Sequence, residues 1–207
     1  MIPSMGLDDA LLALARGEVI AVPTDTVYGV AASLARPEAI ATLFLLKHRP
    51  TSVALPVLAD SIEQIEACGV QWSPSARRLA DALWPGPLTI VVAAPAQLAA
   101  SIGSSSPSVG FRIPNDPQLR AILAQSGPLC VTSANNHGEP PCQSASQVRA
   151  VFEGSTLLAG IVDGGERAGT VSSVVQLSDS TWRILRQGAI DAHVIASLLG
   201  DDGEITH

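Results

Sequence analysis

Short apolar runs and amphipathic helical patterns alternate along the whole chain. The spacing of apolar residues, with Ser, Asp or Pro near several starts, predicts helices at 7–16, 38–47, 60–68, 73–83, 115–127, 144–152 and 191–199. Runs rich in valine, leucine and isoleucine predict strands at 18–22, 55–58, 88–93, 109–113, 128–132, 161–162, 173–177 and 182–185. This alternation is typical of an α/β fold with an open, mixed sheet flanked by helices.

The chain shows no change of composition that would separate two domains. Its 207 residues are enough for one sizeable core, and 47% hydrophobic against 15% charged residues favours a compact fold. We therefore expect one domain over residues 1–200 and an acidic C-terminal tail over residues 201–207.

The charge balance restricts the partners that this chain can bind. A net charge of -7 argues against a protein that coats nucleic acid, because nonspecific binding depends on neutralising phosphates. A local basic cleft is compatible with the same balance.

We expect a cytoplasmic protein with no membrane contact. The N-terminus lacks the basic and apolar regions of a signal peptide. Residues 82–111 carry no charge, but prolines interrupt this stretch and argue against a membrane span. Cys68, Cys130 and Cys142 are an odd number without CxxC spacing, which predicts neither a disulfide framework nor a zinc site.

Polar side chains gather near the ends of predicted strands. Hydroxyl, carboxamide and guanidinium groups at these ends would form a neutral-to-positive site suited to anionic substrates. Taken singly, the threonines, serines and asparagine also fit ordinary turn and N-cap roles, so both interpretations stay open at this point. The groups are Thr24 to Thr26, Arg112, Ser133 with Asn135, Ser172 with Ser173, and Arg186.

A single lysine stands among eleven arginines. Lys47 lies two positions before Arg49, and an ammonium close to a guanidinium suits a site that handles several phosphate or carboxylate groups. The alternative is that Lys47 complements the dipole of the predicted helix at 38–47 and caps its carbonyls.

Common nucleotide and hydrolase motifs are absent from the sequence. The residue immediately before Lys47, the only lysine, is not glycine, which excludes a Walker A loop, and neither a GxGxxG fingerprint nor a GxSxG elbow occurs. ATP, if it binds, must occupy a different kind of pocket.

Six segments resemble motifs of the YrdC/Sua5 family of threonylcarbamoyl-AMP synthases, and they occur in family order. The resemblance runs from about Leu7 to Ile190, nearly the whole chain. The segments are Val22-Pro-Thr-Asp-Thr-Val-Tyr-Gly29, Lys47-His-Arg-Pro50, Trp84-Pro-Gly-Pro-Leu-Thr89, Val109-Gly-Phe-Arg-Ile-Pro114, Thr132-Ser-Ala-Asn135 and Ile184-Leu-Arg-Gln-Gly-Ala189.

The resemblance implies a single-domain YrdC-like fold, an open twisted sheet with a concave cleft, and a nucleotidyltransferase activity. Such an enzyme makes threonylcarbamoyl-adenylate and pyrophosphate from L-threonine, bicarbonate and ATP, with Mg²⁺ bridging the phosphates. Its product passes to a separate transferase complex that modifies adenosine 37 of tRNA.

The resemblance also implies roles for individual side chains, which would act by positioning and charge stabilisation. It implies no dedicated metal ligands. The implied catalytic residues are Lys47, Arg49, Ser133 and Asn135, those for threonine are Thr26, Arg112 and Ser172, and those for ATP are Arg49, Ser108, Ser133 and Arg186.

The chain departs from the family pattern beside these residues. His48 replaces a glycine, Val53 and Ala54 replace a polar residue and a proline, and Leu58 stands where some members place a threonine-contacting histidine. Two alternatives to the synthase stay open: a YrdC-like RNA-binding or ribosome-assembly module without synthase activity, which would bind RNA weakly, and a relative acting on another carbamoyl compound.

Overall fold

The computed structural model describes residues 2–136, 138–178, 181–200 and 203–205, and these ranges contain eight helices and eleven strands. In chain order the elements are β1 (Ser4–Met5), α1 (Leu7–Ala15), β2 (Val19–Val22), β3 (Gly29–Ser33), α2 (Pro37–Leu46), β4 (Val57–Leu58), α3 (Ile62–Glu66), α4 (Pro74–Leu83), β5 (Leu88–Ala93), α5 (Ala96–Ser101), β6 (Ser108–Arg112), α6 (Pro117–Ser126), β7 (Leu129–Ser133), α7 (Ala145–Val151), β8 (Leu158–Val162), β9 (Ser173–Leu177), β10 (Trp182–Arg186), α8 (Ala192–Leu199) and β11 (Gly203–Ile205).

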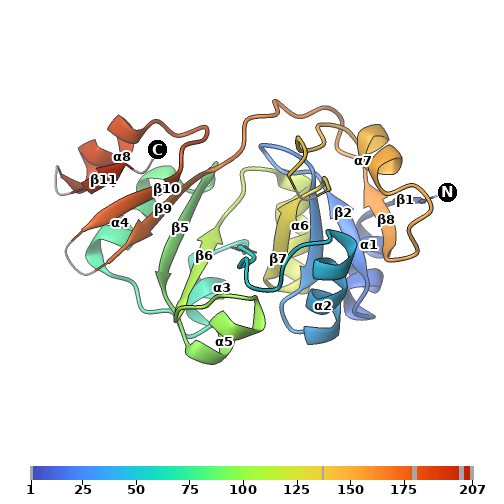
Figure 1. Ribbon diagram of the computed structural model, residues 1–207, viewed down its shortest axis with the longest axis horizontal. Coiled ribbons are helices and arrows are strands. Elements are labelled where there is room, and N and C mark those ends of the chain that lie inside the picture. Colours follow the sequence, from blue (N-terminus) through green and yellow to red (C-terminus); the bar gives the residue numbers. More distant parts are fainter. Residues whose placement is uncertain (1, 137, 179–180, 201–202, 206–207) are drawn as a thin grey trace.

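The described strands form one open, mixed sheet (Figure 1). Their order is β1-β8-β2-β3-β7-β4-β6-β5-β9-β10-β11. Parallel pairs such as β2–β8 and β5–β9 occur beside antiparallel pairs such as β3–β7 and β5–β6. The two-residue strand β4 lies between β7 and β6 and joins the two halves of the sheet. The predicted fold class, an open α/β sheet flanked by helices, is confirmed.

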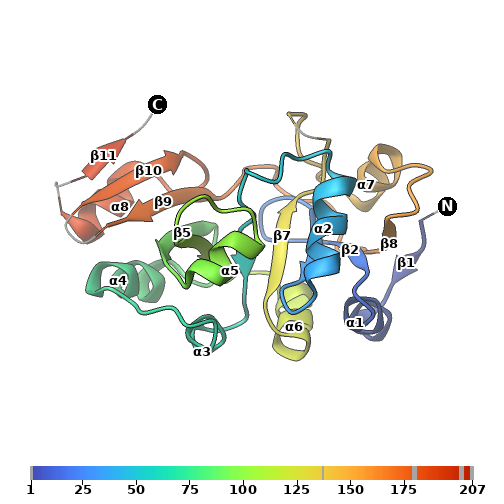
Figure 2. The ribbon, with the colours of Figure 1, turned by 60° about the horizontal axis from the view of Figure 1, so that its bottom comes forward.

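The half of the sheet that contains β2, β3 and β7 has helices on both faces (Figures 1 and 2). Along β2, Val19 and Ala21 belong to the same core cluster as α2, whereas Ile20 and Val22 belong to the cluster that contains α1 and α6. All residues of β2 are buried. A strand buried on both faces has a continuous apolar sequence, which is why this run was recognisable.

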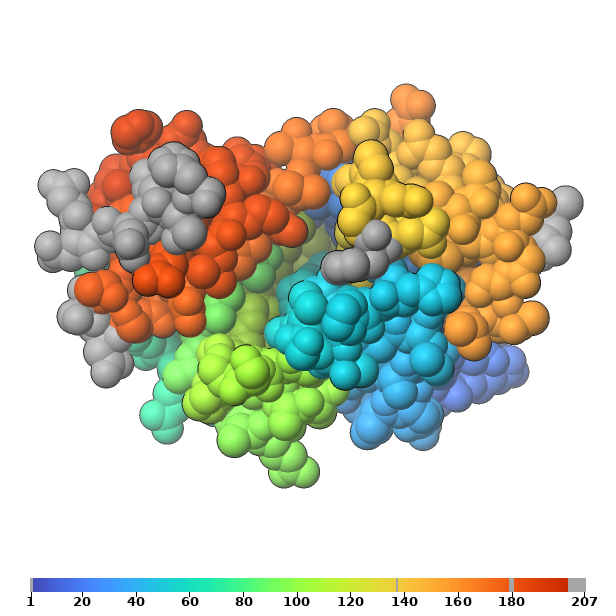
Figure 3. Space-filling view, in the orientation of Figure 1, coloured from blue at the N-terminus to red at the C-terminus, as the bar shows by residue number. Residues whose placement is uncertain are grey.

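The other half of the sheet uses its two faces differently. Leu88 and Ile90 of β5 and Ile184 of β10 belong to the core cluster that includes residues of α4 and α8. The alternate residues of β5, Thr89 and Val91, point to the opposite face and line a cavity. Figure 3 shows a hollow between the two halves of the molecule at this place.

Most predicted elements are present, with ends shifted by up to three residues, but β1, β3, α5 and β11 were not predicted. Strand β3 has the sequence GVAAS, and glycine and alanine are depleted in strands. Its place between β2 and β7 depends on tertiary packing, since all five of its residues are buried.

Part of the segment expected as an acidic tail, residues 201–207, belongs to the sheet. Gly203–Ile205 form β11, which extends the sheet parallel to β10. The other four residues of this segment lie outside the described residues, and the domain boundary at residue 200 stays a prediction.

The uncharged stretch at residues 82–111 forms the end of α4, then β5 and α5, and most of β6. Among the described residues, no helix has both the length and the apolar character needed to cross a membrane.

Candidate active site

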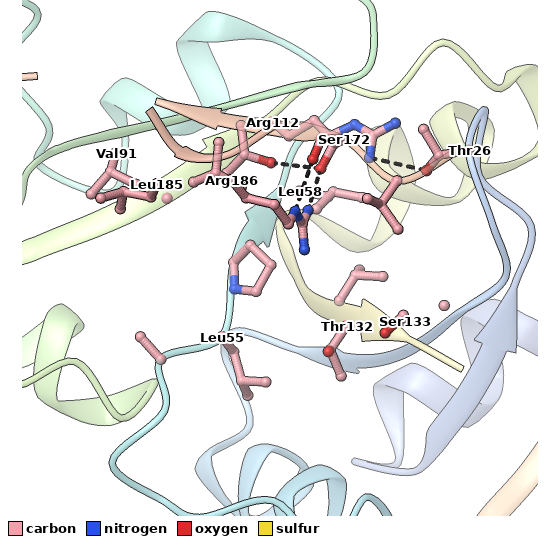
Figure 4. A pocket seen from close by; sticks show the side chains of 18 of the residues that line it. Thr26, Leu55, Leu58, Val91, Arg112, Thr132, Ser133, Ser172, Leu185 and Arg186 are labelled. Carbon is pink, nitrogen blue, oxygen red and sulfur yellow. Dashed lines mark hydrogen bonds between the residues drawn. The ribbon is translucent and has the colours of Figure 1, made fainter. Parts of the chain in front are cut away.

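A cleft of about 430 Å³ lies between the two halves of the sheet. One wall is a face of β5, β6, β9 and β10, and the other is formed by β7, the start of β3 and the segment 54–58 (Figure 4). Within the described chain, three arginines and no acidic side chain line this cleft. The cleft is therefore basic although the whole chain carries a net charge of -7, and such a local field attracts anions.

Among the three arginines of the cleft, Arg186 lies close enough to Arg49 and to Arg112 to repel both. Burial, and to a smaller extent the charge of Arg186, lowers the pKa of Arg49. Arg49 is held in place by its own loop: Nε donates to the carbonyl of Val53 and Nη2 to that of Ala54, each at 2.9 Å. These acceptors belong to the backbone, so the unusual side chains at 53 and 54 leave this support intact.

A β-bulge in β10 directs Arg186 into the cleft. Ile184 and Arg186, two residues apart, pair with consecutive residues of β9. Without this bulge, alternation would place Arg186 on the core-facing side of the sheet with Ile184. In the cleft, Nε of Arg186 donates to the carbonyl of Ser172 (3.0 Å) and Nη2 to its hydroxyl (2.9 Å). The Ser172 hydroxyl also lies 3.2 Å from Oγ1 of Thr89.

The guanidinium of Arg112 is fixed by three acceptors. Nε donates to the carbonyl of Gly86 (3.0 Å), Nη1 to Oγ1 of Thr26 (3.3 Å) and Nη2 to Oδ1 of Asp25 (2.6 Å). The side chains of Arg112 and Asp25 are 6% and 12% exposed. Asp25, which the sequence placed among the polar strand-end residues without a role of its own, therefore offsets the charge of Arg112. Arg49 and Arg186 make no ion pair within the described residues.

The ammonium of Lys47 points into the protein. The residue is 1% exposed, and Nζ donates to the carbonyl of Ser133 (2.6 Å), to Oδ1 of Asn135 (2.6 Å) and to the carbonyl of Asn135. An ammonium has three donors, and all three are used here. Burial, followed by the charge of Arg49, lowers the pKa of Lys47 to about 8. Lys47 thus binds the end of β7 rather than the carbonyls of its own helix.

His48 completes the turn after α2 in a conformation that favours glycine. Its φ is +47°, and its N–H donates to the carbonyl of Leu45 while the N–H of Arg49 donates to that of Phe44. This pair of bonds is the Schellman arrangement, whose left-handed position is usually glycine. The turn brings the backbone back toward the cleft immediately before Arg49.

The nine predicted site residues divide into two groups. Lys47 and Asn135 do not line the cleft, although both contact Ser133, whose Oγ donates to Oδ1 of Asn135 at 2.6 Å. The other seven line it: Thr26, Arg49, Ser108, Arg112, Ser133, Ser172 and Arg186. The structure therefore brings them together, and their roles stay predictions.

Several polar residues of the cleft were not predicted as functional. Their signal in the sequence was weak. Thr89 and Gln176 are polar residues inside otherwise apolar strands, and their neighbours along each strand point into the core. Serines 104 and 106 lie in a loop where composition alone favours a turn. The polar lining residues missed in this way are Thr89, Ser104, Ser106, Thr132 and Gln176.

No cluster of three or more His, Cys, Asp or Glu side chains suited to a metal ion occurs in the described ranges. The lining also offers no carboxylate. These residues do not form a dedicated site for a divalent cation.

The fold and the cleft define an open α/β protein with a basic site for anionic ligands. The family model Sua5_yciO_yrdC, described as "Telomere recombination", matches residues 12–188. The chain belongs to this Sua5/YciO/YrdC family, as its motifs predicted.

Two relatives of this chain have names that state an enzymatic activity. A protein of Mycobacterium tuberculosis (strain ATCC 25618 / H37Rv), whose name includes threonylcarbamoyl-AMP synthase, is 35% identical over 202 residues, which are 96% of this chain and 91% of the relative. The threonylcarbamoyl-AMP synthase of Bacillus subtilis (strain 168) is 33% identical over 90% of this chain, which spans 54% of that protein.

A solved structure supports the same relationship. The crystal structure of P. abyssi Sua5 complexed with L-threonine superposes with a TM-score of 0.88 at 30% identity. The match covers 98% of this chain and 60% of the P. abyssi chain. The described domain therefore corresponds to part of that longer protein.

Proposed function

We propose that this protein is a threonylcarbamoyl-AMP synthase, an enzyme of the nucleotidyltransferase type that joins L-threonine, bicarbonate and ATP into threonylcarbamoyl-adenylate and pyrophosphate. The names of its relatives support this function. The observation that carries it in the structure is a cleft with three arginines and no acidic lining residue in the described chain.

The proposed reaction needs a site for several anions. The amine of threonine and bicarbonate give a carbamate and water. A carbamate oxygen then forms a bond to the α-phosphorus of ATP, the bond from that phosphorus to the bridging oxygen breaks, and pyrophosphate leaves. Carbamate, threonine carboxylate and triphosphate are all negative, so fixed guanidinium groups lower the cost of bringing them together.

The contacts support separate roles for the arginines. Arg49 and Arg186, which have no acidic partner in the described chain, would hold phosphate oxygens. Arg112, fixed by Asp25 and Gly86, would present its remaining N–H groups to the threonine carboxylate. The side chains proposed to complete these sites are Ser108 for ATP, Thr26 and Ser172 for threonine, and Ser133 for the nucleotide and reacting groups.

The role proposed for Lys47 differs from direct phosphate binding. Because its three donors already bind Ser133 and Asn135, Lys47 would position these residues at the edge of the cleft. Asn135 would act with it, since it accepts from both Lys47 and Ser133.

The remaining partners follow from the reaction. Mg²⁺ would enter with ATP as part of the substrate rather than at a site of its own. The product would pass to a tRNA threonylcarbamoyl transferase complex in the cytoplasm. The acidic balance of the chain argues against the RNA-binding alternative, because nonspecific RNA binding depends on neutralising phosphates.

Purified protein with threonine, bicarbonate and Mg-ATP tests the proposal. We expect pyrophosphate release that requires both threonine and bicarbonate, together with an adenylate product detected by mass spectrometry. Pyrophosphate release that ignores threonine, or none at all, would refute the synthase. Binding of RNA without turnover would favour the alternative module.

A further inference from the structure

The segment that joins β8 to β9, residues 163–172, crosses from one half of the sheet to the other (Figure 1). Its last two residues, Val171 and Ser172, line the cleft, and Ser172 is proposed above to contact threonine. The segment is neither helix nor strand. Its path therefore depends on the contacts that its side chains and backbone make with the rest of the protein.

Arg167 makes the principal side-chain contacts of this segment. Its Nη1 lies 3.1 Å from Oδ2 of Asp116, and Nη2 donates to the carbonyl of Gly164 at 2.8 Å. The guanidinium carbon lies 5.9 Å from the ring centre of Tyr28, which is a cation–π distance. The side chains of Arg167 and Asp116 are 16% and 4% exposed, so salt screens this pair only weakly. Arg167 itself does not line the cleft.

The two side chains that Arg167 contacts are held firmly by the protein. Asp116 is the N-cap of α6, where Oδ1 accepts a backbone N–H of the first turn at 2.9 Å. Tyr28 is fully buried, and its hydroxyl accepts from the N–H of Gly164 and donates to the carbonyl of Gly165, each at 2.9 Å. Arg167 therefore fixes the segment to a helix end and to a buried ring.

The segment transmits this position to the side chains proposed to bind threonine. The N–H of Gly169, two residues after Arg167, donates to the carbonyl of Thr26 at 3.1 Å. Ser172 follows three residues later, at the point where the segment enters the cleft. Thr26 in turn accepts from Arg112 at Oγ1. All three groups proposed to contact threonine are thus joined directly or through one hydrogen bond to the segment.

Stability alone does not account for an arginine at position 167. Its Nε is buried and has no hydrogen-bond partner within the described chain, and a buried donor without a partner costs free energy. A buried ion pair is also weak evidence for stability, because desolvation offsets much of its attraction.

We propose that Arg167 is a positioning residue for the threonine subsite, which holds Thr26 and Ser172 at the spacing that threonine needs by fixing residues 163–172. This role rests on the proposed function, in which these two side chains contact threonine. The ATP side of the cleft depends less on the segment. Within the described chain, Arg49 and Ser108 make no hydrogen bond to it, although Arg186 does so through Ser172.

Equilibrium binding of threonine, measured by calorimetry on the full chain without ATP, tests this role. Arg167→Met alone would leave the buried carboxylate of Asp116 without its partner, so the main variant is Arg167→Met/Asp116→Asn, in which both charges are removed and asparagine still caps α6. We expect threonine affinity to fall at least about tenfold, because a displacement of about 1 Å can cost about a hundredfold. ATP affinity, measured separately, should fall less.

Two further variants accompany this measurement. Asp116→Asn alone keeps the cap and the bond from Arg167 to Gly164, so it should show the same selective loss to a smaller degree even if the double variant does not fold. Arg77→Met breaks the exposed ion pair with Asp81 on α4 and is the control, which should change neither affinity.

The outcomes separate this role from the synthase reaction. Unchanged threonine affinity in the Arg167 and Asp116 variants, or an equal loss of threonine and ATP affinity, would overturn the positioning role, and the synthase would stand if threonine-dependent pyrophosphate is released. A selective loss of threonine affinity in a protein that releases no pyrophosphate would keep the role and refute the synthase. No threonine binding by the wild-type protein would overturn the role of Arg167 as well.

Discussion

Removing the ammonium of Lys47 should destabilise the protein as well as inactivate it. From its position two residues before Arg49, the sequence indicated that Lys47 faces ligands. A lysine that only faced ligands could be replaced without loss of stability. In the structure, Nζ ties the end of α2 to Ser133 and Asn135 at the end of β7 and is 1% exposed. Lys47→Met keeps most of the unbranched, flexible stem of the side chain and removes the three donors.

The expected loss follows from the groups left behind. Two carbonyls and the side-chain oxygen of Asn135 lose a charged donor in a buried place, although Ser133 still donates to that oxygen. Leaving a buried polar group without its partner costs about 1–3 kcal/mol, so the two carbonyls that lose their donor predict a loss of about 2–6 kcal/mol. For a chain of this size, about 1 kcal/mol shifts the melting temperature by about 2–4 °C, so Lys47→Met should melt roughly 4–24 °C lower.

Thermal and urea unfolding measure this loss, with Arg16→Met as the control. Arg16 is an exposed cation at the C-cap of α1. Its replacement therefore measures how much a charge at a helix end contributes to the free energy of unfolding, which is about 0.3–1 kcal/mol. A loss for Lys47→Met no larger than that of Arg16→Met would refute the buried anchor and restore the helix-end explanation.

The pH dependence of stability gives a second readout for Lys47. Its pKa of about 8 in the folded protein is below the ordinary lysine value of about 10.4, so between these values the unfolded chain binds more protons. The free energy of unfolding contributed by this group therefore rises with pH from about 8 to about 10.4. We expect the difference between wild type and Lys47→Met to widen over this window, and a constant difference would contradict the lowered pKa.

Three other variants or treatments test separate features. His48→Gly should raise the free energy of unfolding by about 0.5–1 kcal/mol, because glycine adopts the left-handed turn without strain, and His48→Ala should give no such gain in urea melts. A thiol reagent should modify half-exposed Cys68 before Cys130, which is fully buried and whose pKa burial raises to about 12; native-state labelling of Cys130 would contradict this order. Asp25→Asn should cost about 3 kcal/mol and raise the KM for threonine more than that for ATP, since Arg112 loses its carboxylate partner; equal changes in both KM values would argue against a threonine site at Arg112.

The sequence predicted the parts of the fold that depend on local patterns. The buried run of β2 and the Ser73-Pro74 start of α4 were recognisable because apolar spacing and capping residues act within a few positions. Strand β3 was missed because its pairing with β7 is a long-range contact that overrides the weak strand propensity of its residues.

In the site, too, the sequence predicted which residues take part but not the features that depend on long-range contacts. The resemblance brought together residues that do line one cleft, but it could not give the direction of the Lys47 side chain, which depends on the oxygens of β7. The bulge that turns Arg186 toward the cleft depends on the register between β9 and β10, and one extra residue changes the face of every position beyond it. The Asp25–Arg112 pair joins residues 87 positions apart, which no local spacing indicates.

Strand β4 has a mechanical consequence for the cleft. Its two residues pair with β7 on one side and with β6 on the other, so the walls of the cleft are connected through a very short ladder. Longer strand pairs, such as β5–β6 and β3–β7, resist deformation within each wall. A change of sheet twist therefore costs least at β4, where few hydrogen bonds oppose it. Rotation about Val57–Leu58 would widen or narrow the cleft only as far as the Arg112–Asp25 pair, which joins the same two walls, allows.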